Sequence, residues 1–398
     1  MRKDMNRLFI LPLLLLLLQS GCSQRPPLSG KLEFSPDGDW GNMVYLIQPR
    51  MLDEVAASYT GAVIDSAEVQ ADGSFAFEQM PDTPESILLE LVVQRKKERF
   101  LNRLDNDDPL MANYFPIIWK NGESLEVVAS VAQFQRSFAI KKPSPENAAL
   151  LELRDIRQAG LEKLLTQNHS EAHDEAALLE KEAAVLDFQK PLMDFAEQSN
   201  DLLPALMAIR WVSPENDFER IPEFLYTQCE KWKAQNADHP WVVQLCEKGN
   251  REQLPILQGD PLPDASLPML AGDTSTLYQL LGERLTILDL WASWCAPCRR
   301  ENRDVLVPVW SDFHEKGLQI IGYSLDGSEN AWKKAIEKDG AYRWVHASHL
   351  QGDDAPFLQT LRLQTIPANF ILDAHGTVLK KNLHGADLVR FVEEYMGR

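Results

Sequence analysis

The chain has 398 residues, 44% of them hydrophobic, and a formal net charge of −19 at pH 7. A chain of this length can bury more than one hydrophobic core, so we expect two or three domains. The acidic balance repels phosphate backbones and therefore disfavours nucleic acids as partners. Its five cysteines are too few for a scaffold that depends on many disulfides.

Residues 1–21 have the pattern of an export signal. Three basic residues precede an apolar run from Leu8 to Leu18, and Ser20-Gly21 then leads to Cys22. The run is shorter than the ~20 apolar residues that span a bilayer, so we expect cleavage rather than a retained transmembrane helix.

The segment Ser20-Gly21-Cys22 resembles the bacterial lipoprotein box, although Gln19 stands where that box usually has leucine. The resemblance implies that Cys22 is lipidated and that the mature protein is anchored to a membrane of the cell envelope, facing the periplasm. An ordinary signal peptide followed by a chance cysteine is the alternative.

Residues 28–142 are predicted to form a β-sandwich-like domain. Short runs rich in β-branched and aromatic residues alternate here with turn signals such as Asp72-Gly73. The segment Ile64 to Glu78 (IDSAEVQADGSFAFE) resembles one hairpin of the N-terminal β-domain of many thioredoxin-like lipoproteins from Bacteroidetes-type bacteria. No cluster of catalytic residue types occurs in this part, so we expect binding or spacing from it rather than chemistry.

Residues 143–255 are predicted to form a helical connector. Apolar residues recur at helical intervals from Ala148 to Leu165 and again from Glu175 to Phe195. No heptad pattern persists long enough for a coiled coil. Cys229 and Cys246 lie in this part, 17 residues apart, and either one structural disulfide or two buried thiols fits the sequence.

Residues 256–398 alternate between strand and helix patterns. Leu285 to Trp291 and Leu318 to Leu325 are apolar strands, each followed by a helical stretch, and a hairpin and an amphipathic helix end the chain. This order predicts an α/β domain. The expected fold class is therefore multidomain, with an all-β domain, a helical connector and an α/β domain in chain order.

Cys295 and Cys298 lie between the first of these strands and its helix, in the sequence LDLWASWCAPCRRE. A haem attachment site needs histidine after the second cysteine, and Arg299 stands there. A structural zinc site needs two further ligands, and the chain has no second pair of this spacing, so we expect no metal. Disulfide exchange is the chemistry that fits.

The segment WASWCAPC closely resembles the active site of the thioredoxin superfamily, and Gly259 to Pro268 (GDPLPDASLP) resembles the approach segment of its TlpA/ResA-like branch. The resemblance covers residues 256–398 and implies a thioredoxin-like fold and thiol–disulfide oxidoreductase activity without a cofactor. It also implies protein thiol or disulfide clients and a membrane electron donor of the DsbD/CcdA kind.

The position of the two cysteines predicts their roles. Cys295 should lie at a helix N-terminus, where free N–H groups and the helix dipole favour a thiolate, so its pKa should fall below the ~8.5 of a free thiol. Cys298, one turn further into the helix, should be the more buried resolving thiol. The side chains of Arg299 and Arg300 are expected in solvent, where screening weakens their charge.

Asp289 lies on an otherwise apolar strand, where a carboxylate is costly unless it is protonated, hydrated or functional. The resemblance implies that it moves protons to and from the inner cysteine; a position on an exposed sheet edge is the alternative. Glu301 is a second candidate acid, for which a surface role fits equally well.

Thr365-Ile366-Pro367 resembles the superfamily's cis-proline segment. The resemblance implies that Pro367 is cis and lies opposite the two cysteines, and that Ile366 offers its backbone to an extended substrate. Trp294 would then form an apolar rim.

The leading interpretation is an exported, lipid-anchored reductase of envelope protein disulfides. Ala296-Pro297 supplies no imidazole between the cysteines and resembles the Gly-Pro dipeptide of reductants. A thiol peroxidase is one alternative, although the chain lacks the Pro-x-x-x-Thr-x-x-Cys frame of peroxiredoxins. A binding or assembly lipoprotein, in which residues 28–252 do the main work, is another.

Overall fold

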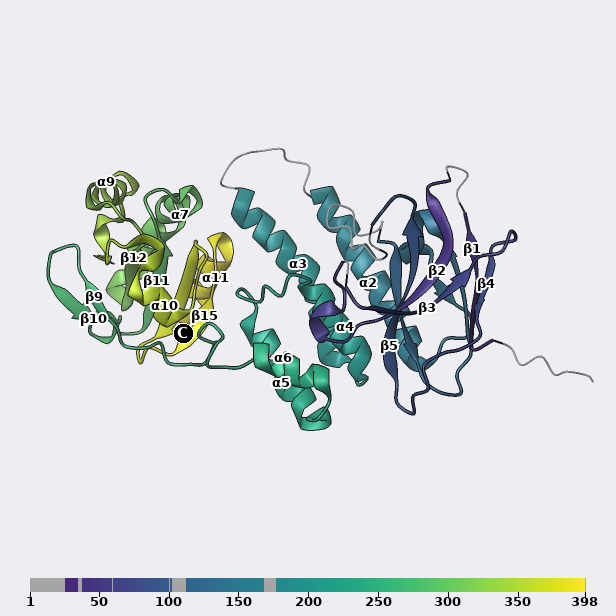
Figure 1. The fold of residues 1–398 in the computed structure, drawn as a ribbon. Helices are drawn as coiled ribbons and strands as arrows, with labels where there is room; N and C mark the ends of the chain where they lie inside the picture. Colours follow the sequence, from purple (N-terminus) through teal and green to yellow (C-terminus); the bar gives the residue numbers. More distant parts are fainter. Residues whose placement is uncertain are drawn as a thin grey trace, which may run out of the picture.

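The computed structural model describes residues 26–34, 38–58, 60–99, 101, 112–167 and 177–397. The predicted export signal and Cys22 lie outside these residues. Figure 1 shows three parts in a row, with the β-domain at one end, helices in the middle and an α/β domain at the other end. The predicted fold class is thus confirmed.

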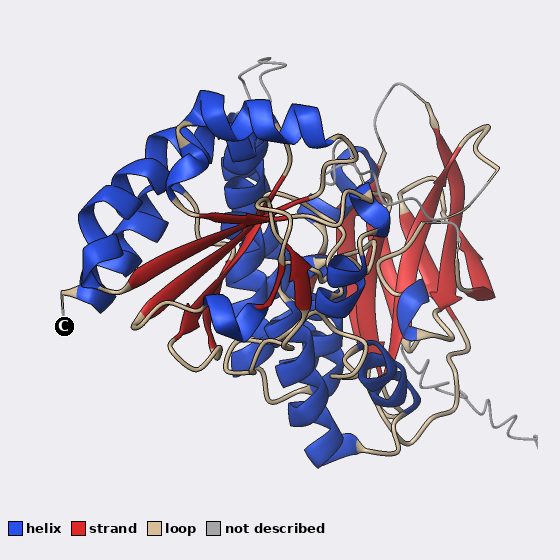
Figure 2. Ribbon diagram, turned by 90° about the vertical axis from the view of Figure 1, so that its left-hand side faces the viewer, coloured by secondary structure: helices blue, strands red, loops and turns tan. Residues whose placement is uncertain are grey.

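The N-terminal part consists of two four-stranded sheets, in the orders β4-β1-β7-β8 and β3-β2-β5-β6. Aromatic and aliphatic side chains from both sheets form one core, as in a sandwich. Its strands lie together at the right-hand side of Figure 2. Their bounds are β1 Leu28–Glu33, β2 Trp40–Gln48, β3 Ala62–Glu68, β4 Ser74–Phe77, β5 Ile87–Arg95, β6 Tyr114–Trp119, β7 Leu125–Ser130 and β8 Ala139–Ile140, with the short helix α1 Phe134–Ser137 before β8.

Two details of the sandwich differ from the sequence pattern. The turn at Asp72-Gly73 does not join two paired strands, because β3 and β4 belong to different sheets. The strand β6 contains Pro116, which cannot donate to a ladder. It pairs with β5 alone, and Asn147 of the connector bonds both the N–H (2.9 Å) and the C=O (2.8 Å) of Ile118 at its free edge.

The middle part is a helical domain built around the buried tryptophans Trp211 and Trp232. A disulfide between Cys229 and Cys246 joins α5 to α6, which decides between the two possibilities left open by the sequence. Figure 1 places these helices between the two other domains. Their bounds are α2 Pro145–Gln167, α3 Ala177–Gln198, α4 Leu202–Val212, α5 Pro222–Asn236 and α6 Pro240–Lys248.

The C-terminal part has a five-stranded sheet in the order β13-β12-β11-β14-β15. β11 is parallel to β12 and antiparallel to β14. The strands are β11 Leu285–Trp291, β12 Leu318–Ser324, β13 Val345–Ala347, β14 Ala368–Asp373 and β15 Val378–Lys381, preceded by the short pair β9 Ser266–Pro268 and β10 Thr274–Thr276. The helices are α7 Ala296–Glu301, α8 Val307–Phe313, α9 Glu329–Asp339, α10 Pro356–Leu361 and α11 Gly385–Met396.

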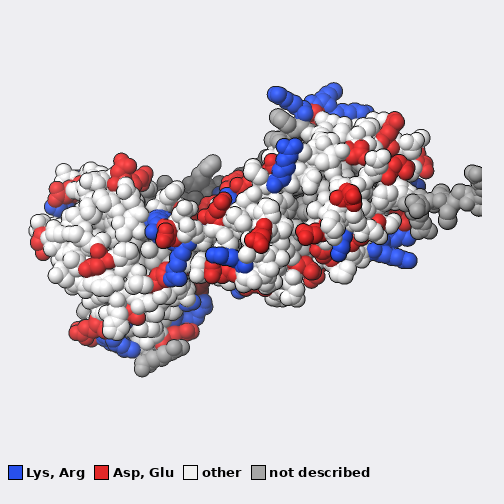
Figure 3. Space-filling model, turned by 60° about the horizontal axis from the view of Figure 1, so that its bottom comes forward, with Lys and Arg blue, Asp and Glu red and all other residues white. Residues whose placement is uncertain are grey.

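Acidic side chains are spread along the face shown in Figure 3 rather than gathered into one patch. Among the described helices, none has the length and apolar character needed to cross a membrane.

Candidate active site: a dithiol after a buried central strand

The central strand β11 leads directly into the site. All seven of its residues are buried, and it is hydrogen-bonded on both sides, to β12 and β14. A strand covered on both edges and both faces reads as a continuous apolar run, which explains the sequence LTILDLW. The chain leaves the sheet after Trp291 and reaches the two cysteines within a few residues.

Asp326 fixes this connection. It is 2% exposed, follows β12, and accepts hydrogen bonds from the N–H (2.8 Å) and the Oγ (2.5 Å) of Ser293. Ser324 donates a third bond to the same carboxylate. Asp326 was not among the predicted site residues. An acid directly after the second apolar strand was a usable signal, because parallel strands end at one edge of the sheet.

Cys295 and Cys298 form a disulfide in the structure. Cys295 is the N-cap residue of α7, and its Sγ accepts a hydrogen bond from the N–H of Cys298 at 3.3 Å. The two residues are 5% and 1% exposed, so the outer position belongs to Cys295. An N–H group aimed at Sγ stabilises negative charge on that sulfur when the bond is reduced.

The Ile366–Pro367 peptide bond is cis, and β14 begins at the next residue. Since Ala368 is in register with Leu290 near the end of β11, this segment enters the sheet beside the strand that leads to the cysteines. Ile366 is half-buried and Trp294 is 60% exposed. The sheet therefore brings the predicted substrate-binding residues to the same edge as the dithiol.

Asp289 is 3% exposed in the central strand, and Glu301 is 5% exposed at the end of α7. Neither residue takes the exposed position that was the alternative for it. Burial, together with the negative charge of Glu301, raises the pKa of Asp289 well above its usual value. Glu301 accepts a hydrogen bond from Gly385 N–H at 3.1 Å, and His384 Nδ1 lies 3.8 Å from it.

The expectation that Arg299 reaches solvent is wrong. Its side chain is 17% exposed and forms an ion pair with the fully buried carboxylate of Asp339, and it also donates to Ser293 C=O at 3.0 Å. The partner lies at the end of α9, forty residues away in sequence, where no local pattern indicates it. The positive charge of Arg299 is thus offset by a buried carboxylate rather than screened by solvent, whereas Arg300 is exposed as expected.

The segment Gln364–Pro367 is also contacted from outside its domain. Glu219 and Arg220, in the loop between α4 and α5, hydrogen-bond to its backbone. The sequence assigned no role to either residue. The helical domain thus reaches the predicted substrate-binding segment.

Comparison with known proteins agrees with this geometry. The model of the AhpC/TSA family matches residues 258–381. Residues of this chain are 26% identical over 142 residues to the thiol:disulfide interchange protein DsbE of Pseudomonas fluorescens, covering 34% of this chain and 72% of that protein. The C-terminal domain thus resembles the thioredoxin superfamily and its TlpA/ResA-like members.

Two further similarities concern the same domain. The thiol-disulfide oxidoreductase ResA of Oceanobacillus iheyensis is 35% identical over 75 residues, which cover 18% of this chain and 38% of that protein. The crystal structure of the thioredoxin domain of a thiol-disulfide oxidoreductase from Bacteroides vulgatus is 29% identical, with a TM-score of 0.33, and covers 35% of this chain and 99% of that one. The names of the curated relatives thus support a redox role for this domain.

A hollow of about 330 Å³ lies beside the dithiol, between the helical domain and the thioredoxin-like domain. Leu179, Glu180 and Ala183 of α3 line one side, and Pro297 and Arg300 of the active-site helix line the other. The helical domain therefore forms part of the surroundings of the active site.

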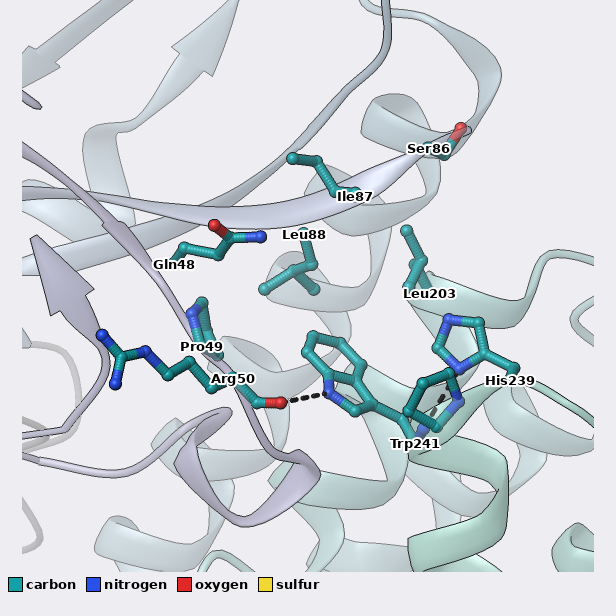
Figure 4. A pocket seen from close by; sticks show the side chains of 10 residues that line it. Gln48, Pro49, Arg50, Ser86, Ile87, Leu88, Leu203, His239 and Trp241 are labelled. Atoms are coloured by element: carbon teal, nitrogen blue, oxygen red, sulfur yellow. Dashed lines mark hydrogen bonds between the residues drawn. The ribbon is translucent and has the colours of Figure 1, made fainter. Parts of the chain in front are cut away.

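A second hollow, of about 380 Å³, lies between the sandwich and the helical domain, away from Cys295 and Cys298 (Figure 4). Trp241 lies across it and donates its indole N–H to Arg50 C=O at 3.3 Å, while His239 Nδ1 accepts from Trp241 N–H at 3.2 Å. These bonds fix the walls of the hollow.

Proposed function

We propose that this protein is an exported, lipid-anchored thiol–disulfide oxidoreductase that reduces disulfides of envelope proteins with the Cys295/Cys298 dithiol. The observation that carries the proposal is the position of Cys295 as the N-cap of α7, with Cys298 N–H directed at its sulfur. Export and the anchor rest on the pattern of residues 1–22.

The reaction proceeds in two displacements. The Cys295 thiolate attacks one sulfur of the client disulfide, which forms a mixed disulfide and releases the first client thiolate. The Cys298 thiolate then attacks Cys295 Sγ and releases the second client thiolate, so the client gains two electrons and the protein loses two. Protons from solvent complete the two client thiols.

Asp289 serves the second displacement in this proposal. Cys298 is 1% exposed, so its proton has no direct route to bulk water. A buried carboxyl with a raised pKa exchanges its proton at a higher pH than an exposed aspartate does, which suits it to take up the thiol proton. Ile366 and Pro367 hold the client backbone, and Trp294 contacts its apolar side chains.

The reducing direction is tested by equilibration with glutathione. We expect a reduction potential close to that of thioredoxin, about −270 mV, rather than that of DsbA, about −120 mV. When Asp289 is ionised, its buried charge disfavours a thiolate near it and so destabilises the reduced form. A potential close to that of DsbA, or a protein that is fully oxidised in growing cells, would reassign it as an oxidase or isomerase.

Clients are identified by trapping. The Cys298→Ser variant cannot resolve the mixed disulfide, so it should accumulate covalent adducts with envelope proteins, which mass spectrometry identifies. The Cys295→Ser variant is the matched control and should form none. A wild-type phenotype in Cys295→Ser cells would favour a binding or assembly role for residues 28–252, and peroxide consumption by the purified protein would favour a thiol peroxidase.

A further inference from the structure

The loop between α4 and α5 makes three hydrogen bonds to the cis-proline segment. Glu219 Oε1 accepts from the backbone N–H groups of Gln364 (3.2 Å) and Thr365 (3.1 Å). Arg220 Nη2 donates to the C=O of Pro367 at 3.1 Å. These bonds hold the backbone on both sides of Ile366, and all three come from a different domain.

The loop itself is anchored in the helical domain. Phe218 is 6% exposed and belongs to the core of that domain. Arg220 also forms an ion pair with Glu182 of α3 through its Nε, and its side chain is 16% exposed. Glu219 and Arg220, called the clamp below, are thus held by the helical domain. They can restrain the segment that they contact, which a freely moving surface loop could not do.

The backbone of Ile366 itself stays available. Within the part of the chain that the structure describes, neither its N–H nor its C=O has a hydrogen-bond partner. An extended peptide adds to such a backbone by main-chain hydrogen bonds, whose geometry requires the receiving segment to be held in place. The clamp hydrogen-bonds to the residues on either side of Ile366 and leaves the backbone N–H and C=O of Ile366 free for a peptide.

We infer that Glu219 and Arg220 are positioning residues, which hold the cis-proline segment so that Ile366 can pair with the extended backbone of a client. The inference rests on the proposed function, because it assigns the clamp to the client-binding step of that reaction. It also gives the helical domain a part in client recognition, beyond spacing the two end domains.

Single-turnover oxidation of the reduced full-length chain tests this role. Two probes carry the same leaving group, 2-nitro-5-thiobenzoate, on different thiols: a short linear peptide with one cysteine, and 2-mercaptoethanol. The second probe has no peptide backbone and cannot pair with Ile366. Glu219→Ala should slow the reaction with the peptide probe by about tenfold and change the reaction with the small probe by less than about twofold.

Three variants sharpen the comparison. Glu223→Ala is the matched control, because Glu223 also joins the two domains, through Gln258 N–H (2.8 Å) and Lys381 (2.7 Å), without touching residues 364–367. Glu219→Gln keeps an accepting oxygen and should recover most of the peptide rate. Arg220→Lys, which loses the forked head group, should slow the peptide probe selectively as well.

Each outcome has a separate meaning. Equal slowing of both probes, or slowing that merely follows a lower Tm, would overturn the positioning role and leave the proposed function standing. Faster reaction of Glu219→Ala with the peptide would identify the loop as a plug and also overturn it. Failure of the reduced wild-type protein to react with either probe would contradict the proposed function itself.

Discussion

Arg299 and Asp339 form a bidentate ion pair, in which the Nε and Nη2 groups of the guanidinium contact both carboxylate oxygens of a side chain with no exposed surface. Arg303 adds a third contact to the same carboxylate at 3.0 Å. Because Arg299 directly follows Cys298, this pair contributes to the charge around the dithiol. Its carboxylate offsets the positive charge that would otherwise stabilise the Cys295 thiolate.

Asp339→Asn should therefore lower the pKa of the Cys295 thiol, by about half a unit, because it removes a buried negative charge and leaves Arg299 uncompensated. It should also cost about 3 kcal/mol of unfolding free energy, since a buried ion pair loses one partner. The pH dependence of Cys295 alkylation measures the first effect. Asp312→Asn, an exposed change of the same charge on α8, is the control, and an equal shift there would contradict the explanation.

In the reduced protein, Cys295 should alkylate much faster than Cys298 near neutral pH. Cys295 has the more exposed position and receives the hydrogen bond from Cys298 N–H, whereas Cys298 is 1% exposed. Mass spectrometry after brief treatment with iodoacetamide locates the modified residue. Equal rates, or faster modification of Cys298, would reverse the assignment of nucleophile and resolving thiol.

Asp289→Asn should slow disulfide exchange by about tenfold to a hundredfold while the fold stays intact, because the amide keeps the shape and cannot carry a proton. The loss should fall on the second displacement, so the mixed disulfide should persist longer than in the wild type. Quenched-flow trapping with acid measures its lifetime. Unchanged turnover between about pH 6 and pH 9 would leave Asp289 with a structural role only.

The same substitution should change how stability depends on pH. The folded protein holds the Asp289 proton at pH values where the unfolded chain, with a carboxyl pKa of ~3.9, has released it. The free energy of unfolding therefore falls as pH rises from about 4 to the raised folded pKa, by about 1.4 kcal/mol per pH unit. In thermal unfolding of the oxidised protein, the Tm of Asp289→Asn should rise relative to that of the wild type as the pH increases over that range.

Glu301→Gln provides the control for this pH effect. It removes the neighbouring charge that contributes to the raised pKa of Asp289, so the loss of stability should end at a lower pH than in the wild type. Identical pH profiles for wild type and Asp289→Asn would mean that Asp289 has no raised pKa in the folded state.

Asn147→Ala should destabilise the sandwich by about 3 kcal/mol, because Ile118 loses partners for both its N–H and its C=O in a buried place. Asn147→Asp should not restore the loss at neutral pH, because its carboxylate would face the Ile118 C=O in a buried place. Calorimetry measures the change, and the reaction rate of the dithiol should stay as in the wild type. No change in unfolding would show that water replaces Asn147 at this edge.

Local sequence signals predicted the strands and helices of the thioredoxin-like domain well. They predicted the contacts around its active site less well. The strand from Leu285 to Trp291 has the predicted bounds, because a strand buried on both faces is marked by a mostly apolar run, here interrupted by Thr286 and Asp289. Pro116 argues against a strand at β6, and the bonds of Asn147 that complete the edge of this strand come from another domain.

The missed features of the site share one physical reason. The contacts of Arg299 with Asp339 and of Glu219 with Thr365 join residues that are 40 and 146 positions apart. Charge and hydrogen-bonding capacity are visible in a sequence, but the partner that satisfies them is set by how the domains pack. The sequence could therefore indicate which residue types carry the chemistry, and not which neighbours hold them.

The disulfide between Cys229 and Cys246 means that this chain contains a bond of the same kind that it is proposed to break. Cys229 is 4% exposed and Cys246 is half-buried, so the bond is spared only while α5 and α6 stay packed. The Cys229–Cys246 disulfide is thus protected by the fold, since an attacking thiolate needs access to a sulfur atom. The same criterion, applied to other proteins, separates disulfides in unfolded segments, which are open to attack, from those shielded in native cores.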